Sequence, residues 1–410
     1  MANLLFLAHR LPYPPDKGDK VRSYHLLRHL AARHRVFVGA FVDDPDDGRH
    51  LPALQQMCAG LQACRLHPRR ARLASLGGLL DGQPLTLHHY RSAELQRWVD
   101  RCIDEQEIDA AVVFSSAMAP YVAQRPNLPL LLDLVDVDSA KWTQYAAHHR
   151  WPMSWLYRRE GRTLLAFERA SVLQARQSFL VTPQEVALFQ RLAPECSGRV
   201  AVSGNGVDAE YFSPDPARGS PFAADEIPLV FTGAMDYWPN VDAVGWFARE
   251  ILPLLRRDWP AARLHVVGRH PTAEVRALQG EAVSVTGAVP DMRPYLQHAA
   301  VVVAPLRVAR GIQNKILEAM AMGRPVVASR ECGAALQAQP GQDVRVAEDA
   351  ASFAQAVGAL LRNPEAAARI GALARECVVS RYSWPAQLQP FDEALAGCLP
   401  SASGRVAKGA

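Results

Sequence analysis

Short apolar runs alternate along the chain with longer segments in which hydrophobic residues recur at helical spacing. Each short run lacks regular polar alternation, as expected of strands buried on both faces of a parallel sheet. The runs predict strands at residues 3–8, 35–42, 109–115, 129–133, 178–182, 199–203, 228–232, 264–268, 283–287 and 301–304. Because helical segments separate most of these runs, the pattern predicts an α/β fold built on parallel sheets.

The segment 301–329 has the most complete pattern, with a strand, a loop, a helix and a second strand. Gly311 opens the helical stretch, and Gly323 followed by Pro325 ends it. The helix therefore begins beside the carboxyl end of a parallel strand, where such sheets bind ligands and helix amides favour anions. Because Lys315 and Glu318 lie three residues apart on one face of this helix, we expect both in a ligand site.

The length and the distribution of turn residues predict two domains. At 410 residues the chain exceeds the size that a single core normally serves. The predicted organisation is an N-terminal Rossmann-like domain at 1–203, a linker rich in turn residues at 204–227, a second Rossmann-like domain at 228–380, a C-terminal helix at 381–399 and a disordered tail at 400–410.

Composition narrows the functional class. Hydrophobic residues make up 49% of the chain and charged residues 21%, as in ordinary globular enzymes, and the net charge of +4 is too small to indicate nucleic-acid binding. No apolar run reaches the roughly 18 residues of a spanning helix, and the first strand begins at once, so a cytoplasmic location is predicted. The seven cysteines form no C-x-x-C pair, so neither a disulfide framework nor a zinc site is expected.

Three basic segments of the first domain suggest further contacts. Gly18 lies between Lys17 and Lys20 at the start of the first helix, which predicts an additional anion contact. Residues 65–91 and 151–162 each combine arginines with large apolar side chains. For residues 65–91 two interpretations remain open, contact with the inner membrane surface and a surface helix that packs its leucines on the sheet. For residues 151–162 they are reception of a lipid-bearing acceptor and packing at a domain seam.

Six motifs in order along the chain carry a resemblance to a known family. They are HRLPYPPDKGDKVRSYHLLRHLA, LLLDLVDVDSAKW, GNGVDAEYFSP, FTGAMDYWPNVDA, the unit at 301–329 and RYSW. Together they resemble the retaining, nucleotide-sugar-dependent glycosyltransferases of family four, and are most similar to bacterial sugar transferases associated with exopolysaccharide and the PEP-CTERM/exosortase system. The resemblance implies the GT-B architecture, in which two Rossmann-like domains face each other across a cleft and a C-terminal helix crosses back to the first domain.

The resemblance also implies roles for individual residues. Glu318 would bind the ribose hydroxyls of a nucleoside diphosphate sugar, UDP- or GDP-linked, because a carboxylate can accept two hydrogen bonds from a vicinal diol. The segment around Val289 would hold the nucleobase. The loop before the helix would direct its amides at the diphosphate and the sugar, through Gly311, Ile312, Gln313 and Asn314. No cofactor is implied beyond this donor substrate.

The chain departs from the family pattern at three places. Arg310 stands where the first glutamate of a conserved pair is expected, and Gly233 is followed by Ala-Met-Asp in place of the usual cations. The positive charge for the diphosphate then falls to Lys315, Arg307 and Arg310. Third, a first-domain histidine of the family is replaced by valine, beside Asp136. Sugar or acceptor contact is therefore predicted for Asp136 and Asp138. His9 is a further candidate for this contact, and its alternative role is to orient its loop. We predict Asp136, Lys315 and Arg310 as the catalytic residues.

The predicted reaction is transfer of a sugar, with retention of configuration, to a saccharide or polyprenyl-linked acceptor in exopolysaccharide biosynthesis. Residues 136–138 also spell D-x-D, a metal-binding pattern of another transferase fold, but the nucleotide signals come late in this chain, so no metal is predicted. Two alternatives remain, a nucleotide-sugar epimerase of the same fold and a non-catalytic nucleotide-sugar-binding scaffold.

Overall fold

The computed structural model describes residues 1–15, 18–147, 149–309, 312–333, 336 and 343–399. They form two units. Unit 1 comprises Met1–Asn205 together with the helical segment from Gln387, and unit 2 comprises Gly206–Ala386. In the described ranges, no helix combines the length and apolarity that crossing a bilayer requires.

Unit 1 is built on a sheet of seven strands in the order β3-β2-β1-β4-β5-β6-β7, with every neighbouring pair parallel. Its strands are β1 (Asn3–Ala8), β2 (Arg35–Val42), β3 (Gly60–Arg65), β4 (Ala110–Phe114), β5 (Leu130–Val135), β6 (Gln177–Leu180) and β7 (Val200–Val202). β3 lacks the uniform burial of the central strands because it lies at an edge of the sheet, which is why its sequence gives no strand signal.

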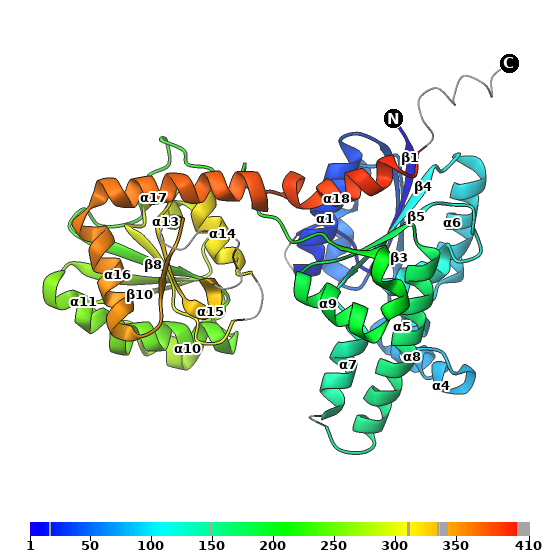
Figure 1. Ribbon diagram of the computed structural model, residues 1–410, viewed down its shortest axis with the longest axis horizontal. Coiled ribbons are helices and arrows are strands. Elements are labelled where there is room, and N and C mark those ends of the chain that lie inside the picture. Colours follow the sequence, from blue (N-terminus) through cyan, green and yellow to red (C-terminus); the bar gives the residue numbers. More distant parts are fainter. Residues whose placement is uncertain (16–17, 148, 310–311, 334–335, 337–342, 400–410) are drawn as a thin grey trace. The chain divides into compact units, whose positions relative to one another are not determined.

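Helices cover the sheet of unit 1, and α7 and α8 extend from it as an antiparallel pair (Figure 1). The α-helices are α1 (Gly18–Ala31), α2 (Leu51–Gln55), α3 (Pro68–Ser75), α4 (Gly78–Asp81), α5 (Leu85–His89), α6 (Ala93–Glu105), α7 (Asp138–Ala147), α8 (Met153–Gln174) and α9 (Pro183–Leu192). Three short helical turns are η1 (Pro45–His50), η2 (Ser116–Tyr121) and η3 (Pro194–Arg199).

Unit 2 contains a second parallel sheet, of six strands in the order β10-β9-β8-β11-β12-β13. Its strands are β8 (Ile227–Thr232), β9 (Ala262–Val267), β10 (Val283–Gly287), β11 (Val301–Ala304), β12 (Val326–Ser329) and β13 (Arg345–Ala347). Its helices, on both faces of the sheet in Figure 1, are α10 (Trp238–Trp246), η4 (Phe247–Ile251), α11 (Leu252–Asp258), α12 (Ala273–Arg276), α13 (Arg293–His298), α14 (Asn314–Ala321), α15 (Arg330–Gly333), α16 (Ala350–Arg362), α17 (Pro364–Cys377) and η5 (Val378–Tyr382). The predicted α/β class with two parallel sheets is confirmed.

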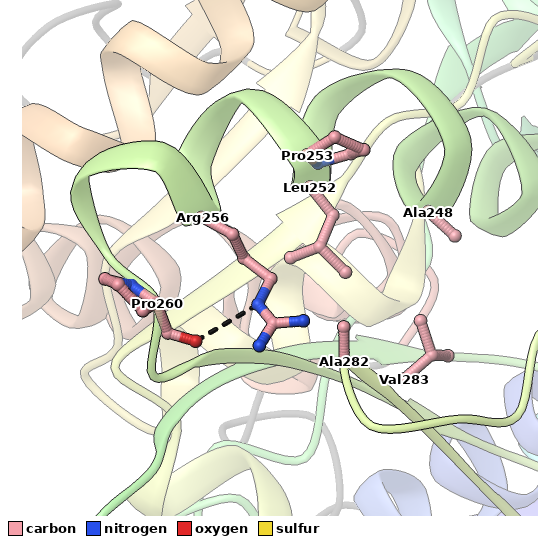
Figure 2. A pocket seen from close by; sticks show the side chains of 7 residues that line it. All are labelled: Ala248, Leu252, Pro253, Arg256, Pro260, Ala282 and Val283. Atoms are coloured by element: carbon pink, nitrogen blue, oxygen red, sulfur yellow. Dashed lines mark hydrogen bonds between the residues drawn. The ribbon is translucent and has the colours of Figure 1, made fainter.

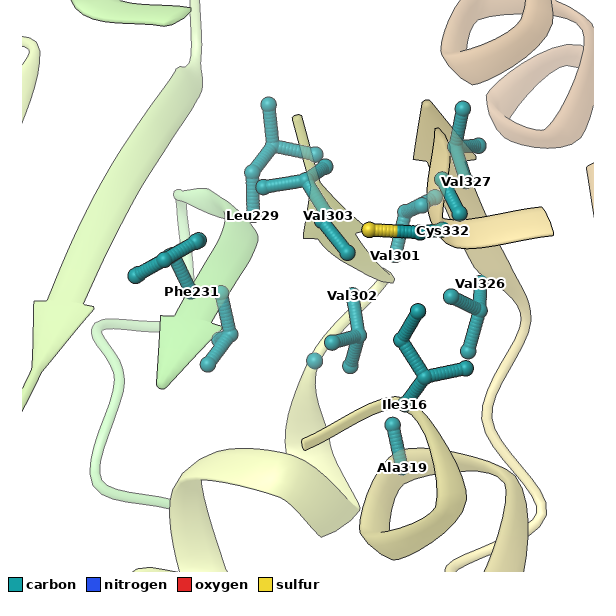
Figure 3. Packing of buried hydrophobic residues seen from close by; sticks show 14 of the residues in the cluster. Leu229, Phe231, Val301, Val302, Val303, Ile316, Ala319, Val326, Val327 and Cys332 are labelled. Carbon is teal, nitrogen blue, oxygen red and sulfur yellow. The ribbon is translucent and has the colours of Figure 1, made fainter. Parts of the chain in front are cut away.

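The core of unit 2 forms around β11 and α14, the elements of the segment 301–329 (Figure 3). Val301, Val302 and Val303 are buried, as expected of a strand with neighbours on both sides and helices on both faces. Ile316 and Ala319 of α14 are also fully buried. These contacts fix the start of α14 relative to the carboxyl end of β11.

The last helix, α18 (Trp384–Ala396), begins in unit 2, and its residues from Gln387 pack in unit 1. Phe391 stacks on Phe179 of β6 with ring centroids 3.8 Å apart. Asp392 accepts hydrogen bonds from His29 at 2.8 Å and from Arg33 at 2.7 Å. His29 is in the last turn of α1, and Arg33 lies two residues after this helix ends.

Candidate active site

In each unit the strand order reverses at one point, and the candidate residues collect at the carboxyl ends of the strands there. In unit 2 the reversal lies between β8 and β11, which pair directly. The residues that follow these strands are Gly233 and Pro305. In unit 1 it lies between β1 and β4, which are followed by His9 and Ser115. Open parallel sheets bind ligands at such points.

Lys315 lies at the switch point of unit 2, in the first turn of α14. Its Nζ donates a hydrogen bond to Asn240 Oδ1 at 2.5 Å and lies 4.1 Å from the centre of the Phe231 ring. Burial lowers the pKa of Lys315 to about 8, against the smaller opposite effects of Cys332 and Glu318. The amides of the first turn of α14 have no acceptor within the helix, so cation and helix terminus together favour an anion.

Asn240, on α10, is a site residue that the sequence analysis missed. It is 5% exposed, and its Nδ2 donates to Ala234 O at 2.8 Å while its Oδ1 accepts from Lys315. A Cβ on Gly233 would lie 2.7 Å from Asn240 Nδ2 and 3.0 Å from Lys315 Nζ, and Gly233 has a φ of +153°. Only glycine therefore fits at the end of β8. The sequence feature that could have indicated Asn240 is its position in the first turn of the helix that follows β8 and Gly233.

Glu318 lies one turn further along α14 than Lys315, and it is partly buried. Within the described ranges no group donates a hydrogen bond to its carboxylate. Burial raises the pKa of Glu318 to about 7, and the nearby Lys315 ammonium acts in the opposite direction. A desolvated carboxylate without a donor is available for a ligand that brings hydroxyl groups.

The other predicted cations are placed differently. Arg307 forms a two-point ion pair with Asp242, with Nε donating to Oδ2 at 2.9 Å and Nη2 donating to Oδ1. Its charge is therefore already partnered. Arg310 and Gly311 lie outside the described residues. Arg269, which follows β9, is exposed and makes no ion pair with any other described residue, so it is a further cation at this sheet edge.

The remaining donor residues line the same edge of the sheet. Gln313 is the residue before α14, Asn314 is its first residue, and Ile312 packs against the core. Val289 follows β10 after Gly287, which has a φ of +70°, and it is partly buried against the core. β10 is two strands from β8 in the sheet, so Val289 lies at the same carboxyl edge of the sheet as Lys315 but further from the switch point.

Unit 1 contains a pocket of about 340 Å³ at its own switch point. His9, Asp136 and Asp138, the three residues predicted for acceptor or sugar contact, all line it. The other lining residues are Asp19, Thr86, Tyr90, Phe114, Ser115, Leu134, Val135, Lys141, Trp142, Tyr145 and Leu164. We call this the acceptor pocket, after the contact that the sequence predicts for these three residues.

Asp136 and Asp138 share one cation in the acceptor pocket. Lys141 Nζ donates to Asp136 Oδ2 at 2.8 Å and to Asp138 Oδ1 at 3.0 Å. Burial lowers the pKa of Lys141, but the two carboxylates outweigh it and hold the pKa above its usual value. In the part of the chain that is described, no group of three His, Cys, Asp or Glu side chains is arranged to hold a metal ion.

Two glutamates from other helices, the buried Glu168 and the partly buried Glu185, hold the segment between β5 and the start of α7. Glu185 Oε2 accepts from Val137 N at 2.7 Å. Glu168 Oε1 accepts from Ser139 N at 3.3 Å, and its Oε2 lies 2.5 Å from the Ser139 hydroxyl. Val135, the last residue of β5, has a φ of +68°, which is unfavourable for a β-branched residue and is retained because its neighbours constrain it.

We expect the Glu168 carboxyl to make unit 1 lose stability as the pH rises. Burial raises the pKa of Glu168 from 4.5 to about 8, so the folded protein keeps a proton that the unfolded chain releases. This contribution is complete below about pH 4.5 and is lost towards about pH 8, on the order of a few kcal/mol. Glu168→Gln keeps the neutral shape and should remove the effect. Melting temperatures of both proteins across this range measure it, and a constant difference between them would contradict the assignment.

His9 belongs to a charged network at the rim of the acceptor pocket. Its ring stacks on Phe114 with centroids 5.8 Å apart, and its Nε2 lies 3.4 Å from Asp19 Oδ2. Asp19 also accepts from Arg10 at 2.9 Å. Burial favours a raised pKa for Asp19, but His9 and Arg10 outweigh it and hold the pKa below its usual range. Gly18 begins α1 directly before Asp19, so an acidic side chain also lies at this helix start.

A further apolar pocket of about 340 Å³ lies in unit 2, between α11 and the starts of β9 and β10 (Figure 2). Leu252, Pro253 and Val283 line it, and Arg256 closes one side by donating to Pro260 O at 3.1 Å. Because Pro260 precedes β9 and Val283 begins β10, this pocket lies at the amino ends of the strands. It is therefore at the opposite edge of the sheet from Lys315.

Residues 226–363 match the family described as Glycosyl transferases group 1. This match lies within the second unit, Gly206–Ala386. A search of curated protein sequences found no significant match. The matched range contains β8, α10, β11 and α14, and with these elements Asn240, Lys315 and Glu318.

Solved structures of glycosyltransferases share the fold of the chain. HepE from Anabaena, in complex with UDP, has a TM-score of 0.62 and 17% identity, with 97% of this chain and 100% of that chain covered. Sucrose-phosphate synthase from Thermosynechococcus elongatus has a TM-score of 0.64 and 18% identity, with 97% of this chain and 99% of that chain covered. WaaG, a glycosyltransferase involved in lipopolysaccharide biosynthesis, has a TM-score of 0.58 and 17% identity, with 95% of this chain and 98% of that chain covered. The fold is therefore GT-B, and the chain is a glycosyltransferase.

Proposed function

We propose that the protein transfers a sugar from a nucleoside diphosphate sugar to a saccharide or lipid-linked acceptor with retention of anomeric configuration. The observation that carries the proposal is the pairing of Lys315 with Glu318 at the switch point of a group 1 glycosyltransferase domain. Lys315 faces the charge of a diphosphate, and Glu318 offers its carboxylate to the ribose. HepE, which has the same fold, has been solved with UDP and with UDP-glucose, and this supports a UDP-linked donor.

The chemistry needs stabilisation of the leaving diphosphate. As the bond from the anomeric carbon to the diphosphate oxygen breaks, negative charge grows on that oxygen. The Lys315 ammonium and the first amides of α14 are fixed in place before the reaction, so they stabilise this charge without reorganising. The acceptor hydroxyl would lie in the acceptor pocket of unit 1, where Asp136 is the candidate group for acceptor or sugar contact. The motif resemblance supports a role in exopolysaccharide biosynthesis associated with the PEP-CTERM/exosortase system.

The reaction is tested with UDP- and GDP-hexoses and acceptor glycans. Release of free nucleoside diphosphate with an acceptor present, and a product with the donor's anomeric configuration by NMR, would support the proposal. An isomerised nucleotide sugar formed from donor alone would indicate the epimerase instead. Donor binding without any turnover over a broad acceptor panel would indicate the scaffold.

We expect Glu318→Gln to weaken UDP binding about tenfold to a hundredfold, because a hydrogen bond to a charged group typically contributes about 1.5–3 kcal/mol. The effect should depend on pH. Glu318 accepts ribose hydroxyls best when ionised, above about pH 7, and Lys315 binds diphosphate when protonated, below about pH 8. Wild-type affinity should therefore be greatest between these values. Titration calorimetry with UDP measures both effects.

The matched control for this experiment is Glu331→Gln, an exposed glutamate of α15 in the same unit. It should leave UDP affinity unchanged. Glu318→Gln should also abolish the loss of affinity on the acidic side and keep the loss on the basic side. Equal UDP affinity for wild type and Glu318→Gln over the whole range would rule out the ribose assignment.

A further inference from the structure

A second cavity, of about 360 Å³, adjoins the acceptor pocket in unit 1. Thr86, Tyr90 and Trp142 line both of them, so the two spaces meet at these side chains. Away from this junction the second cavity is bounded by Leu85 and Leu156, with the exposed Arg72 at its side. We call it the apolar cavity, because half of the residues that line it are leucine, tyrosine or tryptophan.

Hydrogen bonds from two residues of α8, the buried Glu160 and the partly exposed Arg159, hold the walls of the apolar cavity. Glu160 on α8 accepts from Leu85 N at 2.7 Å and from Thr86 N at 2.9 Å, and so caps the start of α5. Arg159 donates to the carbonyl oxygen of Gly78, the first residue of α4, and to that of Gln83, two residues after α4 ends. These hydrogen bonds attach the segment from α4 to α5 to α8, so the position of the cavity wall between them is fixed by specific contacts.

Large hydrophobic side chains around this cavity are exposed to solvent. In the described part of unit 1, most exposed residues of this kind come from two short segments that contribute to the cavity. One segment holds Leu73, which is 70% exposed, Leu76 and Leu80, which is 93% exposed; the other holds Trp151, at 80%, and Trp155. Trp155 is one turn before Arg159, the residue that binds both ends of α4, so the two segments adjoin.

The same two segments are strongly basic. Residues 65–91 and 149–162 together contain nine arginines and two acidic residues. One of the acidic residues, Glu160, is buried under α5, and the other, Asp81, is paired with His88 at 2.8 Å. Arg65, Arg69, Arg158 and others are exposed. Apolar side chains that project among arginines match an anionic bilayer surface in both charge and hydrophobicity.

We propose that this face of unit 1 docks on an anionic bilayer, and that the apolar cavity receives the hydrocarbon chain of a lipid-linked acceptor. The inference rests on the proposed glycosyltransferase function and narrows its acceptor to the lipid-linked class. The shared wall of Thr86, Tyr90 and Trp142 explains the arrangement, since a chain in the apolar cavity would place the attached polar group at the acceptor pocket. The exposed leucines and tryptophans insert among the lipids, and the arginines face their headgroups.

Flotation with vesicles tests the docking. The wild-type protein should float with vesicles of phosphatidylcholine and phosphatidylglycerol and should not float with phosphatidylcholine alone. The double variant Leu73→Asp, Leu80→Asp should reduce the bound fraction at least about tenfold. The control is the double variant Leu173→Asp, Leu192→Asp, which introduces the same two negative charges at exposed leucines elsewhere in unit 1. It should bind vesicles like wild type. Absence of wild-type flotation, or equal loss in both variants, would overturn the proposal.

Occupation of the cavity is tested with dibromostearate, whose bromine atoms quench tryptophan fluorescence only at close contact. Trp142 lines the apolar cavity, and it packs on Tyr157 with ring centroids 5.3 Å apart. Quenching should saturate in wild type and fall in Trp142→Phe, which keeps an aromatic ring in the wall. Identical quenching in both proteins would show that no chain enters the cavity. UDP binding, measured in parallel, reports on unit 2. If the wild-type protein did not bind UDP, the proposed glycosyltransferase function would fail, whereas the quenching result alone decides whether a lipid chain enters the cavity.

Discussion

Replacing Lys315 by methionine is expected to lower kcat by about 10²–10³-fold, the usual effect of removing one fixed donor from a developing negative charge. Lys315 is the cation that the structure places at the end of β8 and the start of α14, held by Asn240 at 2.5 Å. Arg307 is not expected to substitute for it, because its guanidinium is already paired with Asp242. Methionine keeps the length of the side chain and removes only the charge and the donor.

The experiment compares steady-state release of nucleoside diphosphate by wild type and Lys315→Met. Arg256→Met is the matched control, since it removes a cation from the opposite edge of the same sheet (Figure 2). It should keep full activity. The melting temperature of Lys315→Met should be recorded, because Asn240 Oδ1 loses its donor. Wild-type turnover in a folded Lys315→Met protein would remove this residue from the reaction.

Arg22→Met is expected to destabilise unit 1 by about 3–5 kcal/mol, since it leaves a buried carboxylate without its counter-charge. Arg22 on α1 and Asp133 on β5 are both fully buried, with Nε 2.8 Å from Oδ2 and Nη2 3.2 Å from Oδ1. Arg22 also donates to Gly204 O at 2.8 Å. Arg22 thus connects three parts of unit 1: α1, the strand β5, and Gly204 near the end of the segment Met1–Asn205.

Thermal and urea unfolding measure this effect. Arg33→Met is the control, because its pair with Asp392 is exposed and such pairs contribute about 1 kcal/mol or less. The double variant Arg22→Met, Asp133→Leu should recover much of the lost stability, since it removes the unpaired charge together with its partner. If Arg22→Met and Arg33→Met unfold alike, the buried pair does not contribute as inferred.

Much of the donor site could be predicted from local sequence. Lys315 and Glu318 stand three residues apart on one helix, the next helix after a β-branched strand, so helical geometry alone places them together. Asn240 could not be found in this way. It comes from α10, 75 residues before Lys315, and the two side chains meet only because β8 and β11 are neighbours in the sheet.

The acceptor pocket depended still more on tertiary structure. Asp136 and Asp138 stood out in the sequence, but the neutralising Lys141 and the loop's anchors Glu168 and Glu185 were not recognised. No short sequence pattern marks a glutamate that comes to bind a backbone amide 29 or 48 residues away. Both roles arise from packing, and for Glu168 the burial that comes with packing also raises the pKa of its carboxyl.

The sequence by itself determined the α/β class, the central strands of both sheets and the helix that carries Lys315 and Glu318. These features depend on local periodicity and on uniform burial, which neighbouring residues record. Only the tertiary structure decided which cations are free and which are paired, as Arg307 shows, and which surface leucines remain uncovered around the apolar cavity. The reason is physical: charge pairing and burial depend on side chains that are distant in sequence and become neighbours only when the sheets form.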